Sequence, residues 1–143
     1  MTVVVDAAPL VAVADRGDRL AAAVEAVLRD EPGEIVIPAP VTSEVDYLIG
    51  RRLGRAARLA FIEDLGAGRF VVAHLDADDY RTVVDLEHRY ENLDAGLADL
   101  SVVIAAMRHR TRRLLTFDER HFRSLRPLDG GHFTLLPMDE PRP

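Results

Sequence analysis

The chain has 143 residues, of which 48% are hydrophobic and 29% charged, as is typical of one globular domain with a single core. It contains no cysteine, which excludes disulfides, thiolate metal sites and a cysteine nucleophile. Its 18 positive side chains are all arginines, which excludes lysine chemistry, and its net charge of −6 argues against indiscriminate nucleic-acid binding.

No apolar run approaches the roughly 18–20 residues that span a bilayer, and the first residues lack the basic region of a secretory signal. We therefore expect no membrane partner. The absence of cysteine is compatible with a reducing, cytoplasmic location. We expect one domain over residues 1–143, with a loose tail at 138–143.

Strand and helix patterns alternate along the chain. Short β-branched or apolar runs predict strands, and apolar residues at helical spacing predict helices. In chain order the predicted elements are the strand 2–5, the helices 9–14 and 19–31, the strand 34–38, the helices 41–53 and 55–65, the strand 69–75, the helices 77–90 and 95–110, and the strands 113–117 and 132–137. We expect Asp76 to cap the helix 77–90, with Asp79 completing a capping box.

This alternation predicts an α/β fold, with three α/β/α layers around a central parallel sheet of four to five strands. Ligands of such folds bind beyond the carboxyl ends of the strands, at the point where the strand order reverses. That edge of the sheet is therefore the place to look for functional side chains.

Acidic residues from separate segments are expected at that edge. Asp6 ends the first strand and Asp118 follows the strand 113–117. Glu44 and Asp99 lie near the starts of two helices. Each has an ordinary interpretation, as a helix cap, a turn residue or an acid favoured by a helix dipole. Their joint placement favours a common site.

Carboxylates gathered in one place repel each other and raise each other's pKa values, and a hard divalent cation removes that conflict. With neither cysteine nor a paired-histidine motif, a carboxylate site for Mg²⁺ or Mn²⁺ is the natural choice. Such a site activates water for in-line attack on a phosphate. The pattern therefore favours metal-dependent phosphodiester chemistry.

The motifs around these acids resemble those of the PIN domain, and more narrowly the VapC-type ribonuclease toxins of bacterial toxin–antitoxin pairs. The resemblance rests on the first strand with its Asp, on VTSEV, and on LDAGLADLSVVIAA followed by LLTFDERHF, in order along nearly the whole chain. It implies an α/β/α fold and Mg²⁺- or Mn²⁺-dependent cleavage of RNA. It also implies a homodimer and a small antitoxin protein that covers the site.

By this resemblance Asp6, Glu44 and Asp99 match the acidic core of the family, and Asp118 matches its more variable fourth acid. Thr116 matches a position that often carries a hydroxyl near the site. The chain departs from the family at Ala7, where members often have Ser or Thr. Without that hydroxyl, the hydrogen bonds around Asp6 differ, which is expected to alter metal affinity or rate.

Other polar residues have alternative interpretations. Asp94 is either the N-cap of the helix 95–110 or an acid behind the metal ligands, and we favour the cap. Asp46 is expected to be solvated, since two residues along a helix turn it about 200° from Glu44. His121 either touches phosphate or packs against the fold. Two arginine groups, at 51–58 and 108–113, either bind phosphate or solvate the surface, and for the second group we favour solvation.

Other functions remain to be weighed against a ribonuclease. A PIN-fold module that binds RNA or protein with little or no catalysis is the main alternative, favoured by the missing hydroxyl after Asp6. A phosphatase with an aspartyl-phosphate intermediate needs a second acid where Ala8 stands, and a receiver domain needs a lysine. A dinucleotide-binding enzyme needs a glycine-rich fingerprint that does not follow the first strand.

Overall fold

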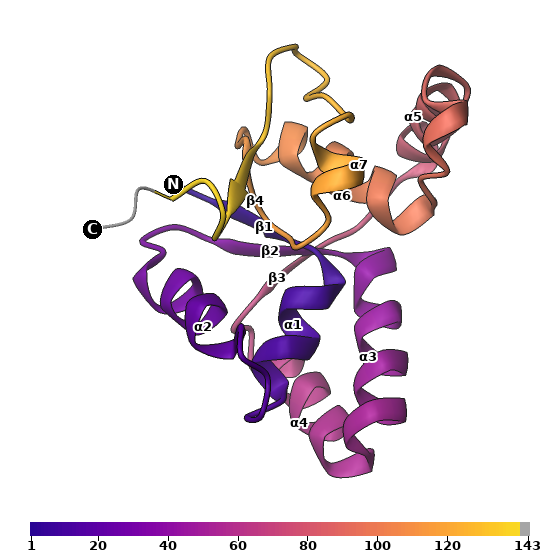
Figure 1. Cartoon of the computed structure of the whole chain (residues 1–143). Helices are drawn as coiled ribbons and strands as arrows, with labels where there is room; N and C mark the ends of the chain where they lie inside the picture. The colour runs from indigo at the N-terminus through magenta and orange to yellow at the C-terminus, as the bar shows by residue number, and fades with distance from the viewer. Residues whose placement is uncertain (141–143) are drawn as a thin grey trace.

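A computed structural model describes residues 1–140 of the chain (Figure 1). Within them the strands are β1 (Val3–Val5), β2 (Ile35–Pro38), β3 (Val71–Ala73), β4 (Arg113–Leu115) and β5 (Thr134–Leu136). The helices are α1 (Ala7–Ala14), α2 (Ala21–Asp30), α3 (Ala39–Leu53), α4 (Arg55–Gly66), α5 (Ala77–Arg89), α6 (Leu97–Arg108) and α7 (Glu119–Phe122), with a 3₁₀ turn, η1, at Glu91–Leu93.

The five strands form one sheet in the order β3-β2-β1-β4-β5, and every neighbouring pair is parallel. Helices α1 to α4 lie on one side of the sheet and α5 to α7 on the other, as Figure 1 shows. The predicted fold class, three α/β/α layers around a parallel sheet, is therefore confirmed.

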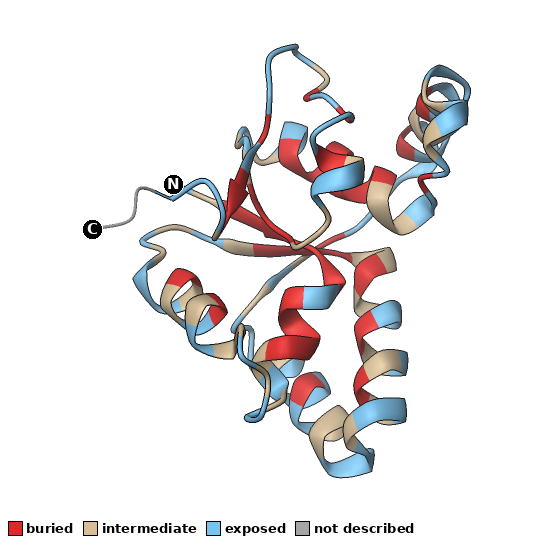
Figure 2. Ribbon diagram, in the orientation of Figure 1, coloured by how far each residue is buried: buried red, intermediate tan, exposed pale blue. Residues whose placement is uncertain are grey.

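The core follows from the apolar runs in the sequence. All three residues of β1 are fully buried, because β1 is the central strand and is covered on both faces. Helix α6 is buried throughout Leu100–Ala106, as its nearly continuous apolar sequence predicts, and it packs on β1 and β2. Figure 2 shows the buried residues concentrated on the strands and on the helix surfaces that face them.

The strand order reverses at β1, which has β2 on one side and β4 on the other. Chains leaving the carboxyl ends of β1 and β4 therefore turn away from each other, which opens the crevice where ligands bind in open α/β sheets. Asp6 remains tied to β4 by its backbone N–H, which donates to the Leu115 carbonyl at 2.9 Å. This pairing fixes the first predicted acid at the mouth of the crevice.

Several local predictions can be compared with the structure. The capping box of α5 is confirmed, since the Asp76 and Asp79 side chains each accept from the other's backbone N–H at 2.9 Å. A turn was expected around Asn92, where η1 lies, whereas the short helix α7 was not predicted. Among the described residues, no helix combines the length and apolarity needed to cross a membrane.

The segment predicted to be a loose tail divides into two parts. Residues 141–143 lie outside the described residues. Within 138–140, Asp139 is held by the guanidinium of Arg123 through contacts of 2.7 and 2.8 Å, and its carboxylate also accepts from the Leu135 N–H. The chain is therefore anchored as far as Asp139, because an ion pair from the α7 segment holds it.

Candidate active site

Asp6 belongs to a buried polar pair at the carboxyl end of β1. Its carboxylate accepts a hydrogen bond from the Thr116 hydroxyl at 2.8 Å, and the two residues are 7% and 0% exposed. The backbone of Asp6 occupies the N-cap position of α1, but its side chain makes no capping hydrogen bond. Helix capping therefore does not account for this carboxylate. The hydroxyl that contacts Asp6 comes from Thr116, directly after β4.

Thr116 also links Asp6 to the fourth predicted acid. Its hydroxyl oxygen accepts a hydrogen bond from the Asp118 backbone N–H at 3.0 Å, and the same hydroxyl donates one to the Asp6 carboxylate. One hydroxyl thus fixes the chain directions after β1 and after β4 relative to each other. The sequence placed Thr116 next to the site, and the geometry gives it two partners there.

Asp118 caps α7 and holds a histidine. Its carboxylate accepts from the His121 backbone N–H at 3.0 Å and lies 2.6 Å from His121 Nδ1. The other ring nitrogen of His121, Nε2, lies 2.9 Å from the Leu93 carbonyl, which can only accept, so Nε2 carries a proton. Nδ1 faces the Asp118 carboxylate. When Nδ1 also carries a proton, the ring is a cation and the contact is an ion pair.

Asp99 joins this pair from the first turn of α6. Its Oδ2 lies 3.5 Å from His121 Nδ1, and one ligand atom each from Asp99, Asp118 and His121 lie within 4.8 Å of one another. Two ligands on opposite sides of an ion at about 2.1 Å are about 4.2 Å apart, so only small side-chain shifts separate the Asp99 and Asp118 carboxylates from a coordinating arrangement.

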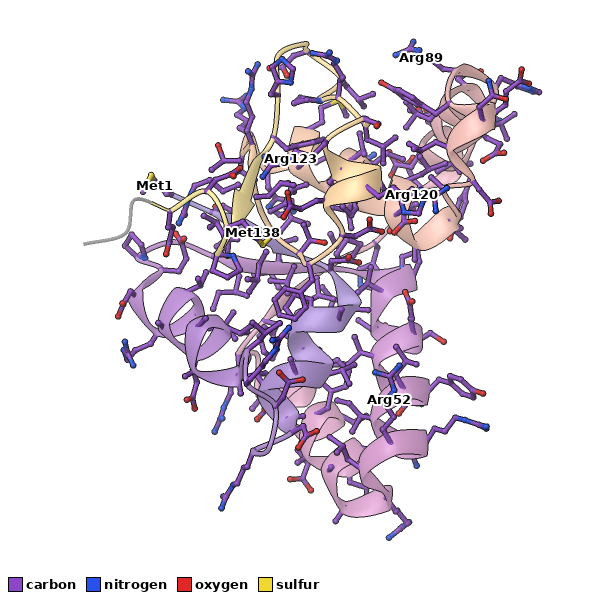
Figure 3. All side chains as sticks on the ribbon, viewed as in Figure 1. Met1, Arg52, Arg89, Arg120, Arg123 and Met138 are labelled. Atoms are coloured by element: carbon purple, nitrogen blue, oxygen red, sulfur yellow. The ribbon has the colours of Figure 1, made fainter. Side chains whose placement is uncertain are left out.

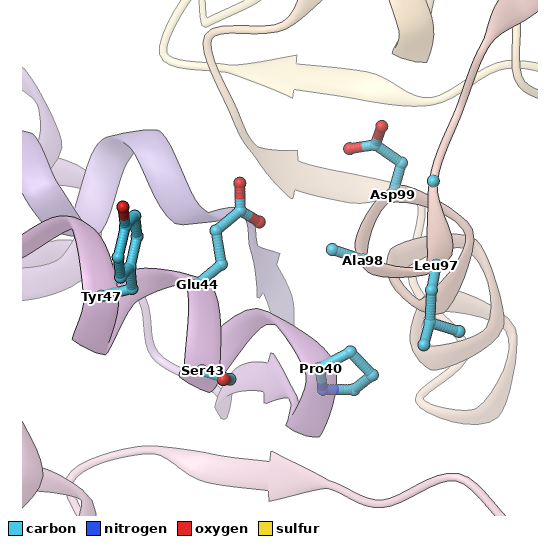
Figure 4. A pocket seen from close by; sticks show the side chains of 8 residues that line it. Pro40, Ser43, Glu44, Tyr47, Leu97, Ala98 and Asp99 are labelled. Carbon is cyan, nitrogen blue, oxygen red and sulfur yellow. The ribbon is translucent and has the colours of Figure 1, made fainter.

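Glu44 stands across a cavity of about 660 Å³ from Asp99. Figure 4 shows the two carboxylates reaching toward each other from α3 and α6, with Tyr47 beside Glu44. Helix α3 begins at Ala39, two residues earlier than predicted, so Glu44 lies beyond its first turn. An interaction with the helix dipole, which acts mainly within that turn, does not explain its position.

The pKa values of three acids respond to this crowding. Burial is the largest cause and raises the pKa of Asp6, whereas the Ala7 N–H and the Thr116 hydroxyl oppose it. Burial and then the charge of Asp6 raise the pKa of Asp99. Partial burial, followed by the charges of Asp6 and Asp99, raises the pKa of Glu44. The negative charges of these side chains therefore repel one another, and a cation among them would relieve the repulsion.

His121 is the positive charge that the chain itself supplies. Burial lowers the pKa of His121, but the hydrogen bond and charge of Asp118, together with the charge of Asp99, outweigh it and the net direction is upward. Because its Nδ1 contacts the Asp118 carboxylate and its Nε2 contacts the Leu93 carbonyl, the ring orients Asp118. The remaining donors are carboxylate oxygens, which fit a hard divalent cation such as Mg²⁺ or Mn²⁺.

Two interpretations of neighbouring acids were wrong. The N-cap of α6 is Gly96 and not Asp94, which is exposed, has a left-handed backbone and forms no hydrogen bond with the cluster among residues 1–140. Asp46 is half-buried and not fully solvated, because Arg58 reaches back from α4 and pairs with it at 2.9 Å. The local sequence did not indicate the Asp46–Arg58 pair, because the arginine comes from the following helix.

The arginines around the fold divide by their partners. In the group 108–113, Arg108 pairs with Asp76 and Asp79, Arg112 with Asp129, and Arg113 with Glu31. We favoured solvation of the surface for this group, and the structure instead pairs these three arginines with acids of the fold. Figure 3 shows Arg52 and other arginines projecting from the outer surfaces of the helices.

The carboxylates at the switch point of this parallel α/β sheet form an acidic group that could hold a divalent cation. The family model of the PIN domain matches residues 3–126, and the chain belongs to this family.

Two known proteins are similar to the chain. It is 34% identical to Ribonuclease VapC26 of Mycobacterium tuberculosis (strain ATCC 25618 / H37Rv) over 134 residues, which cover 94% of this chain and 99% of the relative. Its fold matches the crystal structure of M. tuberculosis VapC20, a sarcin–ricin loop cleaving toxin, with a TM-score of 0.75 at 19% identity, over 81% of this chain and 89% of the other.

One residue of the site was undecided in the sequence. His121 neither packs as an ordinary core residue nor stands free for phosphate, since both its ring nitrogens have partners. The sequence signal for this role was the position of His121 three residues after Asp118. An N-cap side chain commonly accepts a hydrogen bond from the residue three positions further on. The contact with Leu93 depends on the tertiary fold, so no local sequence pattern indicates it.

Proposed function

We propose that this protein is a metal-dependent endoribonuclease and the toxin of a toxin–antitoxin pair. The observation that carries the proposal is the convergence of Asp6, Asp99 and Asp118 around one polar network, with Glu44 facing them across the cavity. The 34% identity to a VapC ribonuclease over 94% of the chain supports RNA as the substrate.

In this proposal Asp6, Glu44, Asp99 and Asp118 hold Mg²⁺ or Mn²⁺. A divalent cation in such a site supplies an activated water and charge stabilisation for in-line attack on a phosphodiester. Thr116 orients Asp6 through its 2.8 Å hydrogen bond. His121 orients the Asp118 carboxylate, since its backbone N–H and its ring Nδ1 contact the two carboxylate oxygens.

The partners follow from the same relationship. We expect a cognate antitoxin protein that covers the site, and a homodimer. The protein is expected to act in the cytoplasm, where its RNA substrate is found. A non-catalytic interaction module was favoured only by the missing hydroxyl after Asp6. Since Asp6, Glu44, Asp99 and Asp118 are all present, the catalytic proposal is preferred.

Cleavage assays on purified protein test the proposal. Wild-type protein is expected to cleave at least one of tRNA, rRNA or mRNA with Mg²⁺ or Mn²⁺. Both EDTA and the substitution Asp99→Asn should abolish the cleavage, because each removes part of the metal site. Cleavage that survives both treatments contradicts a metal-nuclease mechanism, and no cleavage of any RNA class favours the interaction module.

A further inference from the structure

The cavity that contains Glu44 and Asp99 does not end at these acids. Tyr47 lines it, and the same side chain also lines a second cavity of about 520 Å³. The second cavity is further bounded by Gly50, the Asp46–Arg58 ion pair, Arg51 and Arg55. The two hollows therefore adjoin at one aromatic ring, on the outer surface of α3.

The side chains along this path lie on one helix stripe. Tyr47 and Arg51 follow Glu44 by three and seven residues, which places all three on the same face of α3. At 1.5 Å of rise per residue, the stripe from Glu44 to Arg51 is about 10 Å long. That length corresponds to about three nucleotides at 3.4 Å per nucleotide of a stacked strand.

The charges in the second cavity do not cancel. Arg58 is paired with Asp46 at 2.9 Å, which neutralises the acid there. Arg51 and Arg55 are exposed and form no salt bridge among residues 1–140. Two guanidinium groups therefore remain for an external anion, and guanidinium groups favour bidentate contacts with phosphate. In a chain of net charge −6 this is a local positive surface beside an acidic site.

Tyr47 provides the remaining feature. The residue is 61% exposed although it is aromatic, and it lines both the cavity with the acids and the cavity with the arginines. Proteins that bind single-stranded nucleic acid combine such rings, on which bases stack, with positive groups that follow the backbone. A ring and two free guanidiniums in adjoining hollows match that combination.

We propose that Tyr47, Arg51 and Arg55 form a subsite for the single-stranded RNA that flanks the scissile phosphate, with a base stacked on Tyr47 and the backbone phosphates on the two arginines. This assignment rests on the proposed ribonuclease function. It makes the three residues positioning groups for the substrate, and it gives the RNA one direction out of the site, along α3 toward α4.

Binding measurements test the subsite without cleavage. A fluorescein-labelled, mixed-sequence single-stranded RNA is titrated into Asp99→Asn protein in EDTA, at salt concentrations between about 50 and 200 mM. Tyr47→Ala is expected to weaken binding about 5- to 150-fold, the effect of losing one stacked base, while Tyr47→Phe retains it. Arg51→Ala and Arg55→Ala should each reduce the slope of log K against log salt by about 0.7.

Two matched controls accompany these variants. Arg52 is exposed on the same helix, but it is turned about 100° from Arg51 and lines neither cavity. Tyr80 is a tyrosine of similar exposure on α5. Arg52→Ala and Tyr80→Ala should leave affinity and salt slope unchanged. Equal losses in the controls, or no loss in the three subsite variants, would overturn the assignment.

The outcomes separate the subsite from the proposed function. RNA binding that depends on Tyr47 and Arg51, in a protein that cleaves no RNA, supports the subsite and contradicts the nuclease. Wild-type cleavage with an unchanged KM in Tyr47→Ala and Arg51→Ala overturns the subsite and leaves the nuclease standing. Variants that alter sedimentation but not RNA binding identify this surface as a protein interface, which also overturns the subsite.

Discussion

The hydroxyl of Thr116 offers a sharp perturbation of the site, because Thr116→Val keeps the shape of the side chain and removes two hydrogen bonds. The first is its donation to the Asp6 carboxylate at 2.8 Å, and the second is its acceptance from the Asp118 N–H at 3.0 Å. Both bonds connect proposed metal ligands. The substitution should therefore affect folding stability and metal binding together.

The size of the effect follows from burial. A hydrogen bond to a charged group contributes about 1.5–3 kcal/mol, and both partners of the first bond are buried. We expect the free energy of unfolding to fall by about 2 kcal/mol. The Thr116 hydroxyl also lowers the pKa of Asp6, so its loss raises that pKa further and lets a proton compete more strongly with the metal for this carboxylate. Loss of such a supporting hydrogen bond typically weakens metal binding about 10- to 100-fold.

A second threonine provides a matched control. The Thr111 hydroxyl donates to the Thr2 carbonyl at 2.6 Å and accepts from the Arg113 N–H at 3.1 Å, which is the same pattern at the opposite end of β4. Calorimetric titration with Mn²⁺ and urea unfolding should show that Thr111→Val loses stability but keeps metal affinity. Thr116→Ser should keep both. Wild-type metal affinity in Thr116→Val would refute the reasoning.

Three further predictions concern stability. In EDTA at neutral pH, Asp99→Asn should raise the melting temperature while it abolishes cleavage, since it removes one charge from a repelling cluster; a lower melting temperature contradicts this. The raised pKa values of Asp6, Glu44 and Asp99 mean that the folded state binds more protons than the unfolded state. Stability without metal should therefore fall as the pH rises from the ordinary pKa values of 3.8 and 4.5 through the raised pKa values of the folded state. Urea unfolding across pH 4 to 8 checks this, and a rise in stability across that window opposes it. Arg123→Ala should release the turn at Asp139, with faster amide exchange there and unchanged cleavage, because Arg123 pairs with Asp139 and Glu119 and with none of the proposed metal ligands. Unchanged exchange would show that other contacts hold the turn.

The sequence could locate the fold and the acids because both follow from local patterns. Asp6 and Asp118 each end an apolar run, and parallel strands bring their carboxyl ends to one edge. The contacts of His121 and Asp46 could not be predicted, since they depend on residues brought near by packing. The Leu93 carbonyl is 28 positions from His121, and Arg58 reaches Asp46 from the following helix.

The most direct test of the account is the position of a metal ion in crystals soaked with Mn²⁺, located by its anomalous scattering. The account predicts one peak or a close pair in the crevice, coordinated by oxygens of Asp6, Asp99 and Asp118 with Glu44 facing it, and no peak in Asp99→Asn crystals. A fully occupied peak elsewhere, with the crevice empty, would contradict the claim that these acids form the metal centre.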